Sequence, residues 1–203
     1  LRSAIICFGI VMIIVFVASP KNWHFILMGV LGILMCVVFI ATAGYRADRI
    51  RIWLAPEKYD DGYQTMQSLY AIGSGGFFGR GLGNSIQKMG FIPESHNDMI
   101  FSVICEELGL FGAVLTIIMF ILLIYRCTVL AINSGDRFGG LIAVGVMAHI
   151  AVQVLINISV VTNTIPPTGV PLPFISYGGS SIFFLLLEMG LMFAVARQIK
   201  PGR

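Results

Sequence analysis

The stretch PESHNDMIF places three ionisable residues, Glu94, His96 and Asp98, directly before a long apolar run. A carboxylate at such a boundary can act as a general base on a hydroxyl group. A simpler interpretation applies to Asp98 alone, because it stands where a helix N-cap belongs and Asp is a favoured N-cap residue. A cap accounts for one acid but not for Glu94 and His96 beside it, so both interpretations stay open.

Three further acids lie inside apolar segments. Glu106 and Glu107 begin eight residues after Asp98, which is about 12 Å along a straight helix, and Glu188 lies midway along the last apolar run. A charge at membrane depth costs at least about 2.5 kcal/mol, so each acid is expected to face a cavity or a partner. Neighbouring helical residues point about 100° apart, and one acid of the adjacent pair is expected to bind an arginine, with the part of the protein outside this chain as the suggested source. The alternative is that all three are neutral or paired packing residues.

A glycine-rich run, GSGGFFGRGLGNS, covers residues 73–85. A dinucleotide-binding loop needs a preceding strand and a βαβ unit, and neither is predicted here. We expect a close-packed loop instead, because glycine lets the backbone approach a neighbour or a ligand closely. Exposed N–H groups at Gly75 and Gly76 could hold phosphate oxygens, with Arg80 and Lys88 as the cationic partners.

A proline-rich run, PPTGVPLPFISYGGSS, covers residues 166–181. Its prolines exclude a regular helix, and a helix is expected to begin at Ser176 or nearby. The N-terminus of a helix carries partial positive charge and suits an anion, which makes Ser176, Gly178, Gly179 and Ser180 candidate ligands. The alternative is a rigid extracellular turn followed by small residues that allow close helix packing, and both can hold together.

The composition indicates that the elements carrying these residues lie in a membrane. The chain of 203 residues is 57% hydrophobic and only 11% charged, with a mean hydropathy of +0.91, whereas soluble domains average about 25% charged residues. Backbone groups in lipid must be satisfied internally, so apolar runs of this length are expected to be helices. We predict an all-α, polytopic transmembrane bundle forming a single domain, with spans at about 3–19, 23–45, 98–125, 138–164 and 176–196.

The predicted connections differ in length. Pro20–Asn22 is expected to be a tight turn and Arg126–Arg137 a short polar loop. The connection 46–97 is long enough to be functional, and a short amphipathic helix is expected at 63–72. The basic residues weakly favour a cytoplasmic C-terminus, with the long loop outside. Because the chain is already apolar within a few residues of Leu1, we expect it to be the remainder of a longer protein.

Composition also argues against two classes of function. The net charge of +3 is small and scattered, so it does not indicate a nucleic-acid partner. The four cysteines lie in or at the ends of apolar runs without CxxC spacing, and we interpret them as small buried hydrophobic residues rather than metal ligands or disulfides.

Three segments, in this order, resemble the SEDS family (shape, elongation, division and sporulation proteins: FtsW, RodA and their sporulation relatives). They are GYQTMQSLYAIGSGGFFGRGLGNSIQK, PESHNDMIFSVICEELGLFGA and NTIPPTGVPLPFISYGGSS. The resemblance covers essentially the whole chain, and GLGNS followed by QK is more similar to the FtsW and sporulation branch than to RodA. It implies the last five spans of a ten-span fold in the bacterial cell membrane, with a cytoplasmic C-terminus and the long loop 46–97 outside.

The resemblance also implies an activity and a partner. SEDS proteins polymerise lipid II into peptidoglycan glycan strands, and they work with a single-span class B penicillin-binding protein. The family's essential acid lies in a P-E-x-H-T-D motif, whose aspartate falls on Asp98, with Glu94 and His96 as its companions. Asn97 and Met99 depart from the usual threonine and phenylalanine, and both leave the acid in place.

The implied chemistry needs one base and a site for an anion. Asp98 would deprotonate the acceptor's 4-hydroxyl group, which attacks the donor's anomeric carbon and expels the polyprenyl diphosphate with inversion. The diphosphate would need cations, N–H donors or a divalent metal ion, supplied by Arg80, Lys88, the glycine-rich loop or the helix start at 176–181. Two other classes stay open: a transporter that flips lipid II along the acids within the membrane, and a non-catalytic scaffold for the penicillin-binding protein.

Overall fold

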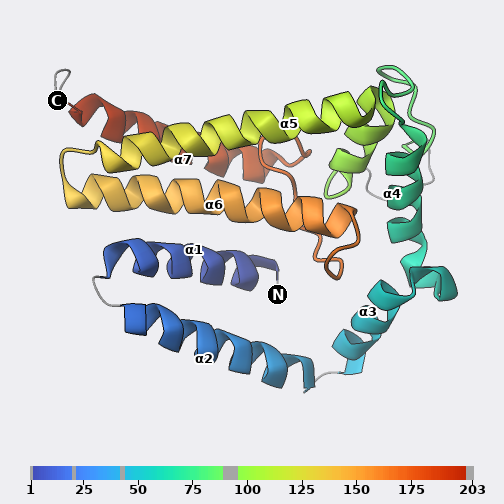
Figure 1. Cartoon of the computed structure of the whole chain (residues 1–203), viewed down its shortest axis with the longest axis horizontal. Coiled ribbons are helices and arrows are strands. Elements are labelled where there is room, and N and C mark those ends of the chain that lie inside the picture. Colours follow the sequence, from blue (N-terminus) through green and yellow to red (C-terminus); the bar gives the residue numbers. More distant parts are fainter. Residues whose placement is uncertain (1, 20–21, 42–43, 89–95, 200–203) are drawn as a thin grey trace. The chain divides into compact units, whose positions relative to one another are not determined.

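The computed structural model describes residues 2–19, 22–41, 44–88 and 96–199, and it contains helices and connecting loops but no strand in these ranges. Figure 1 shows their order. The prediction of an all-α fold is confirmed. The elements are α1 (Arg2–Ala18), α2 (Asn22–Ala41), α3 (Gly44–Leu54), the short 3-10 helices η1 (Pro56–Lys58) and η2 (Asp60–Gly62), α4 (Tyr63–Ser74), α5 (Ile100–Ile132), α6 (Arg137–Val161) and α7 (Gly179–Gln198).

Apolar helices of membrane-crossing length dominate the chain. Among the described residues, α5, α6 and α7 are long and apolar enough to cross a bilayer, while α1 and α2 contribute the shorter apolar stretches Ile6–Ala18 and Trp23–Gly32. These five helices correspond in order to the five predicted spans. The chain is therefore a polytopic membrane protein. The predicted single domain stays a prediction.

Two predicted boundaries are wrong for identifiable reasons. Helix α5 continues to Ile132, so the loop expected at Arg126–Arg137 shrinks to residues 133–136. Arg126 looked like the end of the span, but a long cationic side chain can stay on a helix and extend its charge towards water. The last helix begins at Gly179 rather than at Ser176, which lies in the preceding non-helical segment. The tight turn predicted at Pro20–Asn22 falls mostly outside the described residues.

The chain separates into two compact units, which we describe one at a time. The first contains residues 1–38, 120–153 and 178–203, and the second contains residues 39–119 and 154–177. In the first unit, glycines bring helices close together: Gly9 of α1 faces Val152 of α6, and Gly139 of α6 faces Val195 of α7. Small residues at helix contacts are the usual means of close packing in membranes.

The second unit is organised around the C-terminal end of α6. The α4 hydroxyl of Ser68 donates to the Val161 carbonyl at 3.1 Å, and the indole N–H of Trp53 in α3 donates to the Asn163 carbonyl at 2.9 Å. The predicted amphipathic helix is therefore confirmed as α4, and the long connection between α2 and α5 is ordered by contacts with residues more than ninety positions later in the chain.

The glycine-rich loop follows α4 and packs against a kink in α5. Gly109 has φ +65 and ψ −161, which divides α5 into two helical segments. A Cβ atom at Gly75 would strike the Cys105 carbonyl, one at Gly79 the Glu107 carbonyl, and one at Gly109 the backbone of Phe77 and Gly79. The predicted close-packed loop is confirmed, because only residues without a Cβ atom allow these two backbones to approach.

We expect Gly79→Ala to destabilise the protein, because Gly79 has φ +73 and its position is crowded by α5 backbone. The left-handed conformation alone costs an L residue about 1–2 kcal/mol. Gly73→Ala is the matched control, because nothing lies within 4 Å of its added methyl group. The midpoint of thermal unfolding of the full-length protein in detergent should fall for Gly79→Ala and hold for Gly73→Ala. Equal midpoints for the two variants would contradict the packing described.

Candidate functional site

Two of the three predicted catalytic residues, His96 and Asp98, lie in a short turn, residues 96–99, immediately before α5. Three consecutive main-chain carbonyls of this turn accept hydrogen bonds from later parts of the chain. The His96 carbonyl accepts from the Tyr177 N–H at 2.8 Å, and the Asn97 carbonyl accepts from the Ser176 hydroxyl at 2.5 Å. The Asp98 carbonyl accepts from the Asn157 amide at 2.7 Å. The structure thus brings residues 96–98 together with the end of α6 and the proline-rich segment.

Asn157 is the central residue of this arrangement. It is completely buried, and its amide nitrogen donates to the Val170 carbonyl at 2.8 Å as well as to the turn. Ser176 has a similar double role, because its oxygen also accepts from the Leu172 N–H at 2.7 Å. Two buried side chains therefore fasten the acidic turn to the loop between α6 and α7.

These three hydrogen bonds place no requirement on the type of side chain at positions 96–98. All three bonds end on main-chain oxygens, so they do not require a carboxyl group at position 98. The His96 side chain is exposed and Asp98 is half-buried. Glu94 lies outside the described residues. A turn fixed through its main chain can hold a carboxylate in a defined position, which is what a general base needs.

The carboxylate of Glu106 binds the glycine-rich loop and the residues that follow it. It is fully buried, and its carboxylate accepts from the Ser85 hydroxyl at 2.5 Å and from the N–H groups of Ile86 and Gln87 at 3.1 and 3.3 Å. The Arg80 Nε atom lies 3.7 Å from the same carboxylate. The expectation that one of the paired acids binds an arginine is confirmed, but this arginine comes from the glycine-rich loop of the same chain and not from outside it.

Glu107 and the backbone complete this contact. The Lys88 ammonium donates to Glu107 at 2.5 Å, while the N–H groups of Arg80 and Gly81 donate to the carbonyls of Glu106 and Glu107 at 3.0 and 2.9 Å. The two acids, which point in different directions, therefore bind two different cations of one loop. Arg80 and Lys88, the predicted diphosphate ligands, are each engaged with an internal carboxylate.

The remaining predicted anion ligands lie in varied surroundings. Gly75 is buried against α5 and Gly76 has φ +56, with its carbonyl accepting from the Leu110 N–H at 2.8 Å. Ser176 is buried and bonded as described above. Gly178, Gly179 and Ser180 lie at the start of α7 and belong to the other compact unit. Within the described ranges, no three His, Cys, Asp or Glu side chains come together to hold a metal ion.

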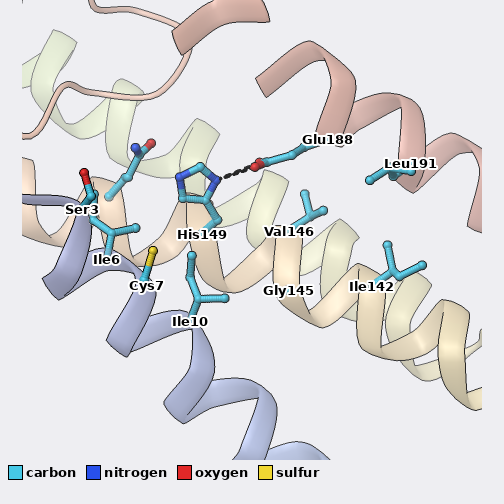
Figure 2. A pocket seen from close by; sticks show the side chains of 11 residues that line it. Ser3, Ile6, Cys7, Ile10, Ile142, Gly145, Val146, His149, Glu188 and Leu191 are labelled. Atoms are coloured by element: carbon cyan, nitrogen blue, oxygen red, sulfur yellow. Dashed lines mark hydrogen bonds and ion pairs between the residues drawn. The ribbon is translucent and has the colours of Figure 1, made fainter. Parts of the chain in front are cut away.

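Glu188 finds its partner in the first compact unit. Both of its carboxylate oxygens lie 2.8 Å from Nδ1 of His149 on α6, and Figure 2 shows this pair beside a cavity between α1, α6 and α7. The cavity has a volume of about 540 Å³, and Gln153 is among its lining residues. An acid within a span is thus paired with a neighbouring helix, as the cost of burying a lone charge requires.

Sequence reasoning missed three polar residues of α6. His149, Gln153 and Asn157 recur every fourth position in an otherwise apolar segment, and that spacing puts them along one face of a helix. The periodicity was a usable signal, because polar groups inside a span need partners. Their partners, a carboxylate on α7 and main-chain carbonyls in two loops, carry no sequence signal of their own.

Comparisons with known proteins identify relatives over nearly the whole chain. A family model described as cell cycle protein, FTSW_RODA_SPOVE, matches residues 1–201. Stage V sporulation protein E of Bacillus subtilis is 41% identical over 199 residues, which are 97% of this chain and 54% of that protein. A probable peptidoglycan glycosyltransferase FtsW of Trichlorobacter lovleyi is 36% identical over 200 residues, 98% of this chain and 52% of that protein.

Two solved structures share the fold. A chain from a peptidoglycan synthase complex, studied for the coordination of polymerization and crosslinking, superposes with a TM-score of 0.76 at 28% identity, covering 100% of this chain and 57% of that chain. A mutant of the rod shape determining protein RodA of Thermus thermophilus superposes with a TM-score of 0.62 at 26% identity, covering 98% and 50%. The chain spans about half the length of the relatives it matches.

We expect Asn157→Leu to loosen the acidic turn, because two buried carbonyls lose their donor at a cost of about 1–3 kcal/mol each. Asn133→Leu is the matched control, since Asn133 is exposed just after α5 and its amide donates to the Val129 carbonyl four residues earlier. Hydrogen exchange measured by mass spectrometry on the full-length protein should be faster at Tyr177 in Asn157→Leu than in the control. Unchanged protection of Tyr177 would show that Asn157 does not hold the turn.

Trypsin offers a direct test of the Glu106 contact, because Arg80 is a trypsin site within the glycine-rich loop. Glu106→Gln removes the charge that attracts Arg80, and it places an amide N–H₂ where the buried carboxylate accepted hydrogen bonds. We expect cleavage after Arg80 to be at least about tenfold faster than in wild type. Glu57→Gln, at an exposed acid, should leave the rate unchanged, and resistance of both variants would contradict the contact's role.

Proposed function

Because the chain belongs to the FtsW/RodA/SpoVE family, we propose that it carries the catalytic base of a peptidoglycan glycosyltransferase, and that this base is Asp98. The observation that carries the proposal is the triple fastening of the turn 96–98 to residues 157–177. These three bonds end on main-chain oxygens, and they hold the turn that carries the half-buried Asp98 carboxyl group at the start of a membrane helix. The relatives named as probable peptidoglycan glycosyltransferases support the reaction class.

In the proposed reaction, two lipid-linked saccharides react at the membrane surface. The Asp98 carboxylate takes the proton of the acceptor's 4-hydroxyl group, and that oxygen forms a bond to the anomeric carbon of the donor. The bond between this carbon and the diphosphate oxygen breaks, and the polyprenyl diphosphate leaves with the electron pair. Configuration at the anomeric carbon inverts. One protein carboxyl group suffices, because the leaving group is a stable anion that needs no protonation.

The departing diphosphate requires positive groups around it. Arg80 and Lys88 are the proposed cations, and their pairing with Glu106 and Glu107 sets how they would act. Each ion pair is partly exposed on its cationic side, with 38% of the Arg80 side chain and 25% of the Lys88 side chain accessible. They would therefore bind the diphosphate as members of a fixed ion network rather than as mobile side chains. Gly75, Gly76 and the start of α7 stay weaker proposals.

The partner and the orientation are also proposals. The likeness to a chain of a peptidoglycan synthase complex supports an association with a penicillin-binding protein that cross-links the strands. An external position for the long loop 46–97 would place Asp98, which follows it directly, on the same side as the growing glycan, with the C-terminus in the cytoplasm. The proposed location is the bacterial cell membrane.

A transporter of lipid II is the second candidate, and one observation favours it. The cavity between α1, α6 and α7 is lined by the His149–Glu188 pair (Figure 2), and polar groups in such a place can line a translocation path. The other two acids on which this reading depends, Glu106 and Glu107, instead hold the glycine-rich loop. Movement of labelled lipid II across protein-containing vesicles would separate this candidate from polymerisation.

Asp98→Asn should abolish polymerisation by the full-length protein while leaving it folded. General bases contribute about 10²–10⁴-fold, so we expect glycan strands made from purified lipid II, measured on gels, to form at least about 10²-fold more slowly. Asp60→Asn is the control, because it makes the same change at an exposed acid.

A rate for Asp98→Asn within about twofold of wild type would remove this carboxylate from the mechanism. The thermal unfolding midpoint of the variant separates a chemical role from a structural one. A loss of rate with an unchanged midpoint supports the base, whereas a loss of both would point to an N-cap.

A further inference from the structure

The tip of the glycine-rich loop presents large apolar side chains outside any helix. Phe77, Phe78 and Leu82 are 73%, 88% and 76% exposed, the highest exposures of apolar residues in the described loops apart from Tyr177. Exposed apolar residues on a spanning helix are explained by lipid, but these three lie on an irregular, hydrogen-bonded loop. Large apolar side chains exposed close together in the chain, outside any helix, are typical of a contact with a membrane or another molecule.

The main-chain conformation of the loop tip is fixed by its glycines and by hydrogen bonds to α5. Gly76, Gly79, Gly81 and Gly83 all have positive φ angles, between +56° and +95°, and the N–H groups of Arg80 and Gly81 are bonded to α5 carbonyls. With the main chain tied on both sides of Phe78, the aromatic side chains cannot turn inwards without breaking these contacts. The exposure is therefore a property of the fold.

The contact between the loop tip and α5 indicates the depth of the tip relative to the bilayer. The carbonyls of Gly76 and Phe77 accept from the N–H groups of Leu110 and Phe111 at 2.8 and 3.2 Å. These are the first residues after the kink at Gly109. Residues 110–132 cover about 34 Å at 1.5 Å per residue, close to the hydrocarbon thickness of about 30 Å. The span thus begins at the kink, and the loop tip lies at the boundary of the hydrocarbon.

The neighbouring residues match the chemistry of that boundary. Leu110 and Phe111 are themselves 53% and 68% exposed, so apolar surface continues from the tip onto the start of the span. Arg80 lies between Phe78 and Leu82 with 38% of its side chain exposed, and a cation next to apolar side chains is suited to lipid phosphate groups.

We propose that Phe77, Phe78 and Leu82 form a membrane anchor that inserts into the interfacial region of the bilayer at the N-terminal end of residues 110–132. The anchor binds lipid, with acyl chains against the apolar side chains and headgroup phosphate near Arg80. Since the loop is bonded to Glu106 and Glu107, the anchor fixes the height of α5, and of the turn before it, relative to the membrane. The proposal does not depend on the reaction catalysed.

Tryptophan fluorescence tests the anchor in the full-length protein. Phe78→Trp and Leu82→Trp are made in a background without other tryptophans, which replaces Trp23 and Trp53 in this chain, and each variant is reconstituted in phosphatidylethanolamine–phosphatidylglycerol vesicles. Ile118→Trp, on the exposed face of α5, is the lipid-facing control, and Glu57→Trp, at an exposed acid, is the aqueous control. Quenching is measured with lipids brominated near the headgroup end and with acrylamide.

We expect Phe78→Trp and Leu82→Trp to be quenched by brominated lipid at least about twofold more than Glu57→Trp, and by acrylamide at least about twofold less. Strong acrylamide quenching without lipid quenching would place the tip in water and overturn the proposal. Protection from both quenchers would also overturn it, because the tip would then be covered by protein, either another part of the full-length molecule or a second copy.

Discussion

Hydrogen bonding of an irregular backbone beside the membrane is the constraint on which this structure depends. The turn 96–99 and the proline-rich loop are not helical, so their carbonyls cannot be satisfied within their own segments, and unsatisfied groups in a low-dielectric environment cost several kcal/mol each. The side chains of Asn157 and Ser176 supply hydrogen-bond partners to main-chain groups of both segments. The position of Asp98 is a consequence of these hydrogen bonds.

The same constraint explains why several charged side chains near the spans have structural roles. Glu106 and Glu107 occupy a segment of α5 beside a kink, where the glycine-rich loop needs acceptors for its N–H groups and counter-charges for Arg80 and Lys88. Glu188 and His149 satisfy each other between two helices. The three acids inside apolar segments therefore each have a basic partner in the described part of the chain.

Much of this architecture could be predicted from the sequence. Apolar runs predicted the membrane helices, prolines predicted the non-helical loop after α6, and glycine content predicted a close-packed loop before α5. The position of the kink could not be predicted, because Gly109 in an apolar run also fits a straight helix, and its left-handed conformation arises from the approach of Phe77 and Gly79. Glu106 and Glu107 lie just before this kink and bind residues in or next to the glycine-rich loop.

The candidate site was only partly predictable for the same physical reason. The acidic residues were visible as charges before an apolar run, and their assignment to a known motif came from a resemblance. Their attachment was not visible, because the bonds reach carbonyl oxygens, which every residue has. Asn157 contacts segments 59 positions earlier and 13 positions later in the chain, and only tertiary structure reveals which carbonyls it meets.

Labelling of Asp98→Cys tests the central claim most directly, namely that this side chain faces water on the outer side of the membrane. The full-length variant is made without other cysteines and exposed, in intact spheroplasts, to a charged maleimide that cannot cross the membrane. Asp136→Cys, in the loop between α5 and α6, reports the opposite side. The account predicts labelling of Asp98→Cys in intact spheroplasts and of Asp136→Cys only after lysis. Labelling of Asp98→Cys only after lysis, or not at all, would contradict it.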